Sequence, residues 1–551
     1  MYEIKKFLSK NIFFIFLIFI TVIIVGYKLT VQIELGPVWD TYDFLLNALE
    51  FAGMGIGYSD MLRPPLLPFL TSIIFRFGFI SANVIFLIDA ILFIFGTVGL
   101  YLLLKLRFSS LGSFLGCFIY LTMPIVLTFI ASGLSDLPSI SFSIWTIYFI
   151  VLGIKRNPKF FYLAFPFFLF AFLTRYSSAL IIFPIILFLY MNRDLIKNKT
   201  HLMVGIILCF IILTPVLIFF SLKYMNPFYP FFSFFSSTTG PSLTSSIFYN
   251  PDLLFFIKLP EMVGREVIVI IIAIIWGFLI YETLKIKRLK HNLSHRLTII
   301  KKINFIILMV LILVFVITFG KIFYMFSEII FFLICILIYE LFSPRFKNLD
   351  FNLLFIAWFM SYFIFHSIYA IKDARYFLTM APALSYFLIL GLNFLSKSFK
   401  LKIKGINLTF PIFSILISCM LIFSVTTSYF PSIVQENSGV KYLNQDFIDA
   451  SNWLKSYDPN YKEKIIYSDF WPYSSWYLKM DIKKMPIFKG EDKFYSGIKD
   501  YNITSLDIKK YDQELKNSNA TYYFGVRKKL NLTSFEPIKE FGVVVLYKKM
   551  T

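Results

Sequence analysis

Runs of about twenty predominantly apolar residues recur along most of this 551-residue chain. The first run begins at Asn11, soon after Lys5, Lys6 and Lys10, and no small-residue cleavage site follows it. An apolar helix of this length crosses the hydrocarbon core of a bilayer, whereas shorter apolar stretches usually belong to soluble cores. Because 58% of the residues are hydrophobic and only 15% are charged, the sequence predicts an α-helical polytopic membrane protein with an uncleaved first span.

Thirteen transmembrane helices are expected from these runs. Their approximate limits are 11–31, 82–104, 110–130, 137–153, 159–173, 178–191, 202–222, 264–284, 303–319, 322–342, 351–370, 376–395 and 407–429. A shorter apolar segment, "PLLPFLTSIIFRFGFI" (65–80), contains Arg76. Its length and charge favour a helix lying in the membrane interface, although a span here would reverse the orientation of everything that follows.

Lys and Arg are distributed unevenly between the two sides of these spans. Seven of them lie in "KIKRLKHNLSHRLTIIKK" (285–302), whereas the loops on the other side hold few. Because basic loops stay in the cytoplasm, this segment and the N-terminus are predicted to be cytoplasmic, in a multi-pass protein of the cell membrane. These loops also account for the net charge of +21, and we expect no nucleic-acid partner.

The composition changes abruptly after residue 429. Residues 430–551 contain 19 Lys and Arg and 15 Asp and Glu. Their pattern predicts helices at 446–457 and 473–479 and strands at 464–468, 484–488, 521–526 and 541–547. With thirteen spans this small α/β domain lies outside the cell, where the Asn-x-Thr triplets at Asn502, Asn519 and Asn531 fit. The chain is thus divided into a transmembrane domain (1–429) and an exterior domain (430–551).

Most unusual polar residues near the spans fall on one predicted face, the outer one. The outer segments hold Asp40, Asp43 and Arg63 in the first loop, Asp136 in the second, Arg175 in the turn after span five, and Lys372, Asp373 and Arg375 in the last turn. His366 lies one or two helical turns deeper, and Glu328 lies inside span ten. Charges at a membrane edge are unfavourable unless they are solvated or paired. Their common sidedness therefore suggests a single site.

Each residue alone also has an explanation without chemistry. The basic side chains could extend to lipid headgroups, and Asp43 or Asp136 could cap the helix that follows it. His366 could be a packed interfacial histidine, and Glu328 could hold helices together. None of these explanations accounts for Asp40.

Carboxylates that face cationic turns can bind an anion and deprotonate a neighbouring group. Phosphate is the natural anion at a membrane surface, and arginine binds it through paired hydrogen bonds. A hydroxyl is the natural group to be deprotonated. The pattern therefore favours transfer of a sugar from a lipid-phosphate donor to a hydroxyl acceptor on a glycan, a lipid or a protein, at the bilayer surface.

Several short segments, taken in order, resemble the membrane glycosyltransferases of the GT-C superfamily. They are Asp40 in the first outer loop, "RPPL" at its end, "SDLP" before span four, "LTR" after span five, "NPFYP" (226–230) and "KDARYFLTMAP" (372–382). The likeness is closest to the family 39 type, which includes protein O-mannosyltransferases and lipid A aminoarabinose transferases. It covers nearly all of the transmembrane part and, in layout, the C-terminal domain.

The resemblance implies a GT-C fold with its active site in the outer loops. It also implies inverting transfer of a sugar, such as a hexose like mannose, from a polyprenyl- or dolichyl-phosphate donor. The catalytic candidates are Asp40 as the base, with Asp43 and Asp136 beside it. The candidates for the donor phosphate are Arg375, Arg175, Lys372 and Arg63, and those for additional contacts are His366, Asp373 and Glu328.

One position departs from the family pattern. The family usually has a second acid directly after the first, where this chain has Thr41. If residues 40–43 form a helical turn, Asp40 and Asp43 share a face, so Asp43 could replace that acid, support the acceptor or cap the helix. A divalent metal stays open, and because His366 is the one outer histidine, the metal ligands of some relatives cannot be transferred here.

Two other classes of protein would use the same outer charges. A transporter or flippase of lipid-linked sugars should also place polar residues near the midplane and at an inner gate, but the inner face shows mostly scattered lysines. A sensor with an exterior ligand-binding domain would leave Asp40 and Arg375 without a role. An enzyme is therefore the favoured interpretation.

Overall fold

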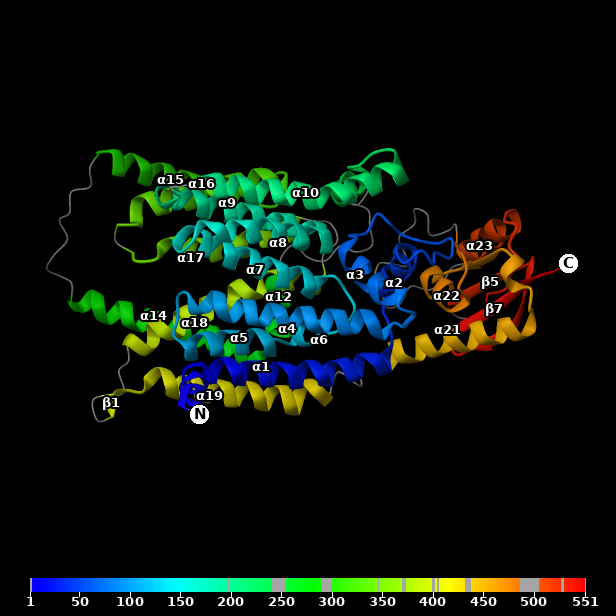
Figure 1. Cartoon of the computed structure of the whole chain (residues 1–551), viewed down its shortest axis with the longest axis horizontal. Coiled ribbons are helices and arrows are strands. Elements are labelled where there is room, and N and C mark those ends of the chain that lie inside the picture. Colours follow the sequence, from blue (N-terminus) through cyan, green and yellow to red (C-terminus); the bar gives the residue numbers. More distant parts are fainter. Residues whose placement is uncertain are drawn as a thin grey trace.

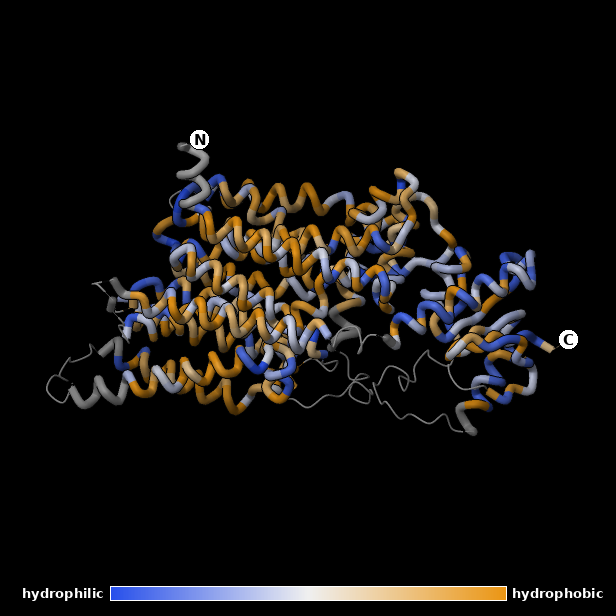
Figure 2. The backbone as a smooth tube through the Cα atoms, turned by 90° about the horizontal axis from the view of Figure 1, so that it is seen from below, coloured by the Kyte–Doolittle hydropathy of each residue, from blue (hydrophilic) through white to orange (hydrophobic). Residues whose placement is uncertain are grey.

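The computed structural model describes residues 2–196, 199–239, 254–288, 299–344, 346–368, 373–398, 402–403, 406–431, 438–485, 505–526 and 530–550. Helices run side by side in a bundle, and a small α/β domain lies beyond one end of it, which we call the domain-side end (Figure 1). The N-terminus lies at the opposite end. Hydrophobic residues are concentrated over the bundle, and hydrophilic ones colour much of the small domain (Figure 2).

Each of the thirteen predicted spans coincides with helical structure. The single helices are α1 (Tyr2–Leu35), α4 (Asn83–Lys105), α7 (Asp136–Lys155), α10 (Lys199–Tyr224), α14 (Arg265–Arg288), α15 (Ile299–Thr318), α16 (Tyr324–Phe342) and α17 (Leu349–Ile368). The composite ones are α5 (Ser110–Thr122) with α6 (Pro124–Phe129), η1 (Pro158–Phe160) with α8 (Phe161–Thr174), η2 (Tyr176–Ile181) with α9 (Ile182–Met191), η5 (Ala374–Thr379) with α18 (Ala381–Ser398), and α19 (Thr409–Ser424) with η6 (Val425–Tyr429). Among the described residues, seven helices are long and apolar enough to cross a membrane.

Several of these composite helices change geometry along their length. Pro124 starts α6 directly after α5 and has no backbone N–H with which to continue the first helix. Spans six and twelve begin as the tighter 3₁₀ helices η2 and η5. The apolar segment 65–80 contains α3 (Leu66–Arg76), whose 11 residues are too few to cross a bilayer, as its sequence predicts.

The small domain is built on a five-stranded sheet. Its order is β4 (Lys483–Lys484), β3 (Ile466–Ser468), β5 (Tyr522–Val526), β7 (Val544–Lys549) and β6 (Phe535–Phe541). β3 is parallel to β4 and β5, and β7 is antiparallel to β5 and β6. Alternate residues of the central strands face opposite sides, so Phe524 packs towards α21 (Ser438–Tyr457) and α22 (Trp471–Leu478), while Tyr523 packs towards α23 (Ser505–Asn517).

The predicted α/β order of this domain is confirmed, with two elements added. The helices predicted at 446–457 and 473–479 are α21 and α22, and the strands predicted at 464–468, 521–526 and 541–547 match β3, β5 and β7. Of 484–488, Lys484 belongs to β4 and 486–488 lie outside the described residues. Two further elements are not predicted from the sequence: α23, which has few apolar residues, and β6, which has Pro537 and an irregular register.

The small domain packs against α2 (Trp39–Phe51) and α3 through a layer of aromatic rings. Trp39 contacts the ring of Trp471 edge-on, with ring centroids 5.0 Å apart. The ring centroids of Tyr42 and Tyr473 are 4.1 Å apart. One buried apolar cluster includes residues of α2, α3, α4, α21 and α22. The helix that carries Asp40 therefore lies between the bundle and the small domain.

Candidate active site

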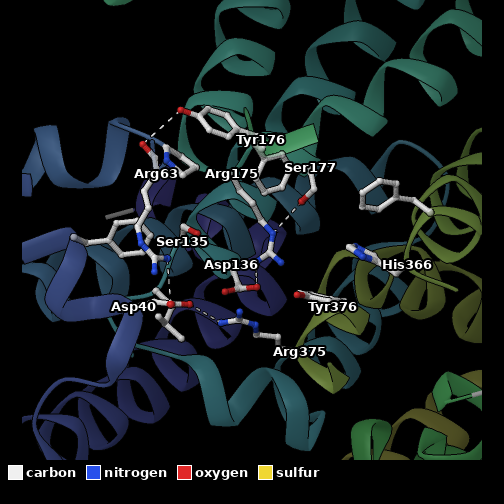
Figure 3. Close-up of a pocket in the computed structure, with 15 residues that line it drawn as sticks. Asp40, Arg63, Ser135, Asp136, Arg175, Tyr176, Ser177, His366, Arg375 and Tyr376 are labelled. Carbon is white, nitrogen blue, oxygen red and sulfur yellow. Dashed lines mark hydrogen bonds and ion pairs between the residues drawn. The ribbon is translucent and has the colours of Figure 1, made fainter. Parts of the chain in front are cut away.

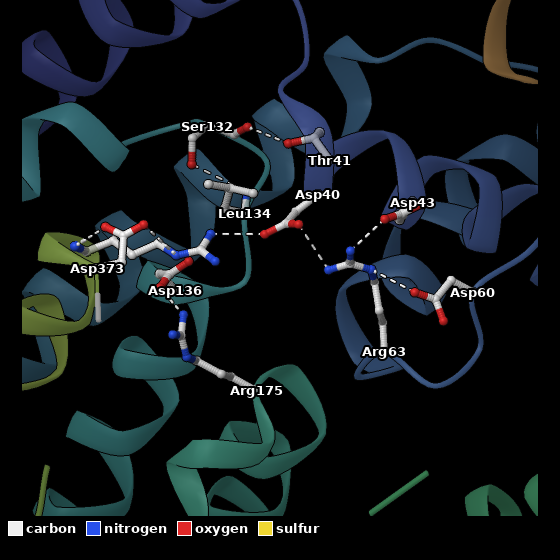
Figure 4. A network of polar contacts seen from close by, with 11 residues as sticks. Asp40, Thr41, Asp43, Asp60, Arg63, Ser132, Leu134, Asp136, Arg175 and Asp373 are labelled. Carbon is white, nitrogen blue, oxygen red and sulfur yellow. Dashed lines mark hydrogen bonds and ion pairs between the residues drawn. The ribbon is translucent and has the colours of Figure 1, made fainter. Parts of the chain in front are cut away.

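Asp40 and Asp43 lie one turn apart on α2. The residue before the helix is Val38, so the prediction that Asp43 caps this helix is wrong, because Asp43 lies within its second turn. The predicted helical turn over 40–43 is present, and both carboxylates contact Arg63 (Figure 4). The Asp40 side chain is 23% exposed and that of Asp43 is 2% exposed. Of the two, Asp40 lines the cavity described below.

Thr41, which stands where the family has its second acid, points away from Asp40. Its side chain is fully buried, and its hydroxyl donates a hydrogen bond to the carbonyl oxygen of Ser132 (3.2 Å). The next residue, Gly133, has a φ of +74°, and a Cβ there would lie 2.8 Å from Thr41 Cγ2. Thr41 therefore fixes the loop that precedes α7 against α2.

Arg63 is held by three carboxylates. Its Nη1 lies 3.1 Å from Asp40 Oδ1, its Nη2 2.6 Å from Asp43 Oδ2 and its Nε 3.1 Å from Asp60 Oδ2. Burial raises the pKa of Asp43 to about 7, against the lowering effect of Arg63, and the nearby charges of Asp60 and Asp40 raise it further. All three nitrogens of the guanidinium are engaged, so Arg63 is held in one position.

Arg375, which is 335 residues from Asp40, contacts the other oxygen of that carboxylate. Its Nη1 lies 2.9 Å from Asp40 Oδ2. Burial alone would raise the pKa of Asp40, but Arg63 and Arg375 outweigh it and hold this pKa well below its usual range. Asp373 caps η5 by accepting a hydrogen bond from the Arg375 backbone N–H (2.9 Å) and is half exposed. Lys372 lies outside the described residues.

Asp136 and Arg175 form a second, more buried pair. Asp136 is the first residue of α7, and its carboxylate accepts a hydrogen bond from Arg175 Nη1. The two side chains are 3% and 13% exposed. Arg175 Nε also donates to Ser177 Oγ (3.0 Å). Burial, reinforced by the charge of Arg375, lowers the pKa of Arg175 to about 10, so an added anion would be favoured beside these two arginines.

These groups surround a cavity of ≈ 130 Å³ (Figure 3). Its charged lining consists of Asp40, Asp136, Arg63, Arg175 and Arg375. They come from α2, α7, the loop before α3, the junction of α8 with η2, and η5. The ring of Tyr376 forms part of the wall, and the guanidinium carbons of Arg175 and Arg375 lie 5.3 Å and 5.6 Å from its centre. The structure thus brings together five charged residues that are scattered over more than 300 positions of the sequence.

His366 completes the wall of the cavity. It lies on α17, is 2% exposed and stacks on Tyr376 with ring centroids 4.6 Å apart. Neither of its ring nitrogens has a hydrogen-bond partner in the described part of the chain. A buried imidazole without partners is unfavourable, which suits a residue whose partner is a bound ligand.

Two intramembrane acids have different positions relative to this cavity. Glu328 is buried on α16 and does not line the cavity. Asp89 of α4 is not among the predicted site residues, yet its Oδ2 accepts a hydrogen bond from the backbone N–H of Gly133 (3.0 Å). It therefore supports the loop that leads to Asp136. Its signal in the sequence is an acid inside an apolar run.

The described residues contain no cluster of three or more His, Cys, Asp or Glu side chains arranged to hold a metal ion. The carboxylates of Asp40, Asp43 and Asp60 do converge, but the guanidinium of Arg63 occupies the space between them. In this arrangement the described residues of the site do not fit a metal ion.

Comparison with known proteins confirms the resemblance and the fold. The model of a family described as dolichyl-phosphate-mannose-protein mannosyltransferase matches residues 62–219. Among solved structures, ArnT from Cupriavidus metallidurans bound to undecaprenyl phosphate is similar at a TM-score of 0.57 and 11% identity, over 98% of both chains. Its apo state gives a TM-score of 0.52 at 12% identity, over 96% of this chain and 97% of that one. No curated protein sequence matches.

Proposed function

We propose that this chain is an integral-membrane glycosyltransferase. It transfers a sugar, such as mannose, from a polyprenyl- or dolichyl-phosphate donor to a hydroxyl acceptor at the outer face, with inversion. The observation that carries the proposal is the Asp40 carboxylate, held between Arg63 and Arg375 at a cavity that also contains Arg175. The family match and the ArnT-like fold support its broader part, a membrane glycosyltransferase of the GT-C type that uses a lipid-linked donor.

The donor phosphate binds between Arg375 and Arg175. Arg63 is engaged by three carboxylates, so it is poorly suited to exchange a partner, whereas Arg375 makes one short ion pair, with Asp40. A phosphate offers paired acceptors to a guanidinium. Its negative charge also offsets the repulsion between the two neighbouring arginines. Lys372, predicted for the same task, stays a prediction.

An apolar groove beside the cavity supports a lipid-linked donor. It has a volume of ≈ 350 Å³ and is lined by side chains of α3, α8 and α10, among them Phe69, Phe170 and Phe219. Pro65 in its wall follows Arg63 by two positions, and Leu173 precedes Arg175 by two. A polyprenyl chain lying in this groove would bring its phosphate to the arginines.

In the proposed reaction, the acceptor displaces the lipid phosphate at the anomeric carbon. The acceptor oxygen attacks that carbon from the face opposite the phosphate while Asp40 removes the hydroxyl proton. The bond between the carbon and the phosphate oxygen breaks, and its electron pair leaves with the lipid phosphate, whose charge Arg375 and Arg175 stabilise. Arg375 helps to hold the pKa of Asp40 low. When the donor is bound, Arg375 turns to the phosphate, and the pKa of Asp40 rises. Asp40 is then a stronger base.

A transfer assay tests the proposal directly. Full-length protein in lipid nanodiscs is incubated with radiolabelled polyprenyl-phosphate mannose, then with other sugars on the same lipid, and with a membrane extract as the source of acceptor. We expect label in an acceptor, release of polyprenyl phosphate and inversion at the anomeric carbon. If no sugar donor is consumed, the proposal fails. In liposomes, movement of intact donor across the bilayer without sugar transfer would establish a flippase instead.

A further inference from the structure

A continuous chain of polar contacts links the small domain to Asp40. The indole Nε1–H of Trp471, the first residue of α22, donates to the Tyr58 hydroxyl (2.8 Å), which donates to Asp43 Oδ1 (3.0 Å). The second oxygen of Asp43 contacts Arg63 Nη2 (2.6 Å), and Arg63 Nη1 contacts Asp40 Oδ1 (3.1 Å). The chain joins two residues that are 431 positions apart.

The loop that carries Tyr58 has another attachment to α2. Asn47 donates its side-chain N–H to the carbonyl oxygen of Asp60 (2.7 Å) and accepts from the Asp60 backbone N–H (2.8 Å). This pair fastens the loop close to Arg63 without help from the small domain. The contact between Trp471 and Tyr58 is therefore a second attachment, which holds the part of the loop around Tyr58 and orients Asp43.

The position of Arg63 matters most when the donor is bound. In the proposed reaction Arg375 moves to the phosphate, so Arg63 becomes the remaining cation that holds the Asp40 carboxylate. Arg63 in turn is oriented by Asp43 and Asp60, and the buried Asp43 is oriented by Tyr58. A displaced guanidinium would let the Asp40 carboxylate rotate away from the acceptor.

We propose that Trp471 and Tyr58 are positioning residues for Asp40, acting through Asp43 and Arg63, so that the docked small domain is a working part of the active site. This inference rests on the proposed function. It assigns Asp43 a role in holding Arg63 rather than one in contact with the acceptor, because Asp43 is buried and does not line the cavity.

The titration of Asp43 provides a signature of this role. With its pKa raised to about 7 by burial, Asp43 becomes neutral as the pH falls through neutrality, and its pair with Arg63 weakens. The hydroxyl of Tyr58 stabilises the charged form, so its removal raises this pKa further and moves the acidic loss of activity to higher pH. The titratable and charged groups that face Asp43 are Arg63, Asp60, Asp40, Tyr58 and, from α22, Tyr473.

The test compares Tyr58→Phe and Trp471→Phe with two control variants of α22. Tyr477→Phe removes a hydroxyl that bridges to Tyr42 (2.7 Å), and Tyr42 keeps its second partner, Asn444 (2.7 Å). Trp476→Phe replaces an indole by a smaller ring. The indole of Trp476 packs on Phe75 of α3, with ring centroids 6.4 Å apart. Both controls alter the interface between the small domain and the bundle and leave the polar chain intact.

We expect Tyr58→Phe and Trp471→Phe to lower kcat about 10- to 100-fold, the scale on which small displacements of reacting groups act. KM for the donor should change little, the acidic limb of the pH profile of Tyr58→Phe should move to higher pH, and both controls should stay near wild type. Wild-type kcat and pH profile in Tyr58→Phe would overturn the inference. Equal losses in the controls would also overturn it, since the effect would then belong to domain docking in general.

A second readout keeps this test separate from that of the proposed function. Hydrogen–deuterium exchange of residues 56–63 should increase in Tyr58→Phe and Trp471→Phe but not in the controls, and it requires no substrate. If the wild type transfers no sugar, the proposed function fails while the exchange data still test the positioning of this loop. If Tyr58→Phe does not fold, Trp471→Phe decides together with Trp476→Phe, which loses the same ring area without a bond of the polar chain. Unchanged kcat and exchange in Trp471→Phe would overturn the inference.

Discussion

The ion pairs that surround the cavity and an ion pair at the other end of the helical bundle use different cations. At the domain-side end, three arginines meet aspartates around a cavity. At the other end, Lys155 of α7 pairs with Asp350 of α17, with Nζ 2.6 Å from Oδ2 and 4.6 Å from the centre of the Phe351 ring. Lys155 and Asp136 lie at opposite ends of α7, about 28 Å apart along a regular helix.

The difference shows that the chemistry of the cation distinguishes an ion pair that only joins helices from one that can take part in a binding site. A lysine ammonium is a compact charge that one carboxylate and one aromatic face can satisfy. An arginine has several hydrogen-bond donors in a planar fork. It can therefore hold a carboxylate and bind a phosphate at the same time, or exchange the carboxylate for a phosphate. The Lys155 pair joins two helices, whereas the arginines of the domain-side end can rearrange around an anionic ligand.

The largest expected effect is on a reporter that tells which end of the bundle faces the outside of the cell. A reporter that fluoresces only in the cytoplasm should be dark when fused after Thr551 and bright when inserted at 285–302, because the basic loop is retained inside. The reverse pattern would place the cavity in the cytoplasm and exclude a donor in the outer leaflet.

At the domain-side end, Asp40→Asn should lower turnover about 10²–10⁴-fold, the usual contribution of a positioned base. Folding should be retained, because Arg63 keeps Asp43 and Asp60 and Arg375 keeps Asp373. Steady-state kinetics with the lipid donor measure this, with Asp194→Asn, an exposed aspartate that does not line the cavity, as the control. Near-wild-type turnover in Asp40→Asn would transfer the assignment to Asp136.

The two exchangeable arginines should have a somewhat smaller effect, about 10²–10³-fold in kcat/KM for the donor, since each supplies part of the charge stabilisation. Arg375→Ala tests this directly, and Arg375→Lys should restore activity only in part, because lysine lacks the fork. For Arg175, removal also leaves the buried Asp136 unpaired, which is strongly unfavourable. The informative variant is therefore Arg175→Ala with Asp136→Asn, with folding checked by size-exclusion chromatography. Wild-type donor kinetics in these variants would remove both arginines from the site.

At the opposite end the expected effect is smallest and falls on stability. Lys155→Met should lower the free energy of unfolding by about 1 kcal/mol, since this pair is partly exposed, and should leave transfer within about twofold of wild type. Thermal-shift measurements beside Lys159→Met, an exposed neighbour, check this. A large loss of activity without a loss of stability would contradict the division between the two ends.

Much of the site is predictable from the sequence because its residues stand out locally. Asp40, Asp136, Arg175 and Arg375 are charges at the ends of apolar runs, and the alternation of spans assigns them to one face. The pairing of Asp40 with Arg375, the burial of Asp43 and the position of Glu328 away from the cavity could not be predicted in this way. Each depends on how helices pack, and a side chain's sequence position does not state which neighbour it meets.

The sequence by itself determined that this protein is a bundle of membrane helices with an α/β domain at its C-terminal end. The reason is that hydropathy and periodicity are local properties, and a run of about twenty apolar residues has few other stable structures in a bilayer. Only the tertiary structure decided that Trp471 reaches Asp40 through Tyr58, Asp43 and Arg63. Those contacts arise where the small domain docks on α2, and hydrogen bonds a few ångströms long are set by that docking rather than by any pattern along the chain.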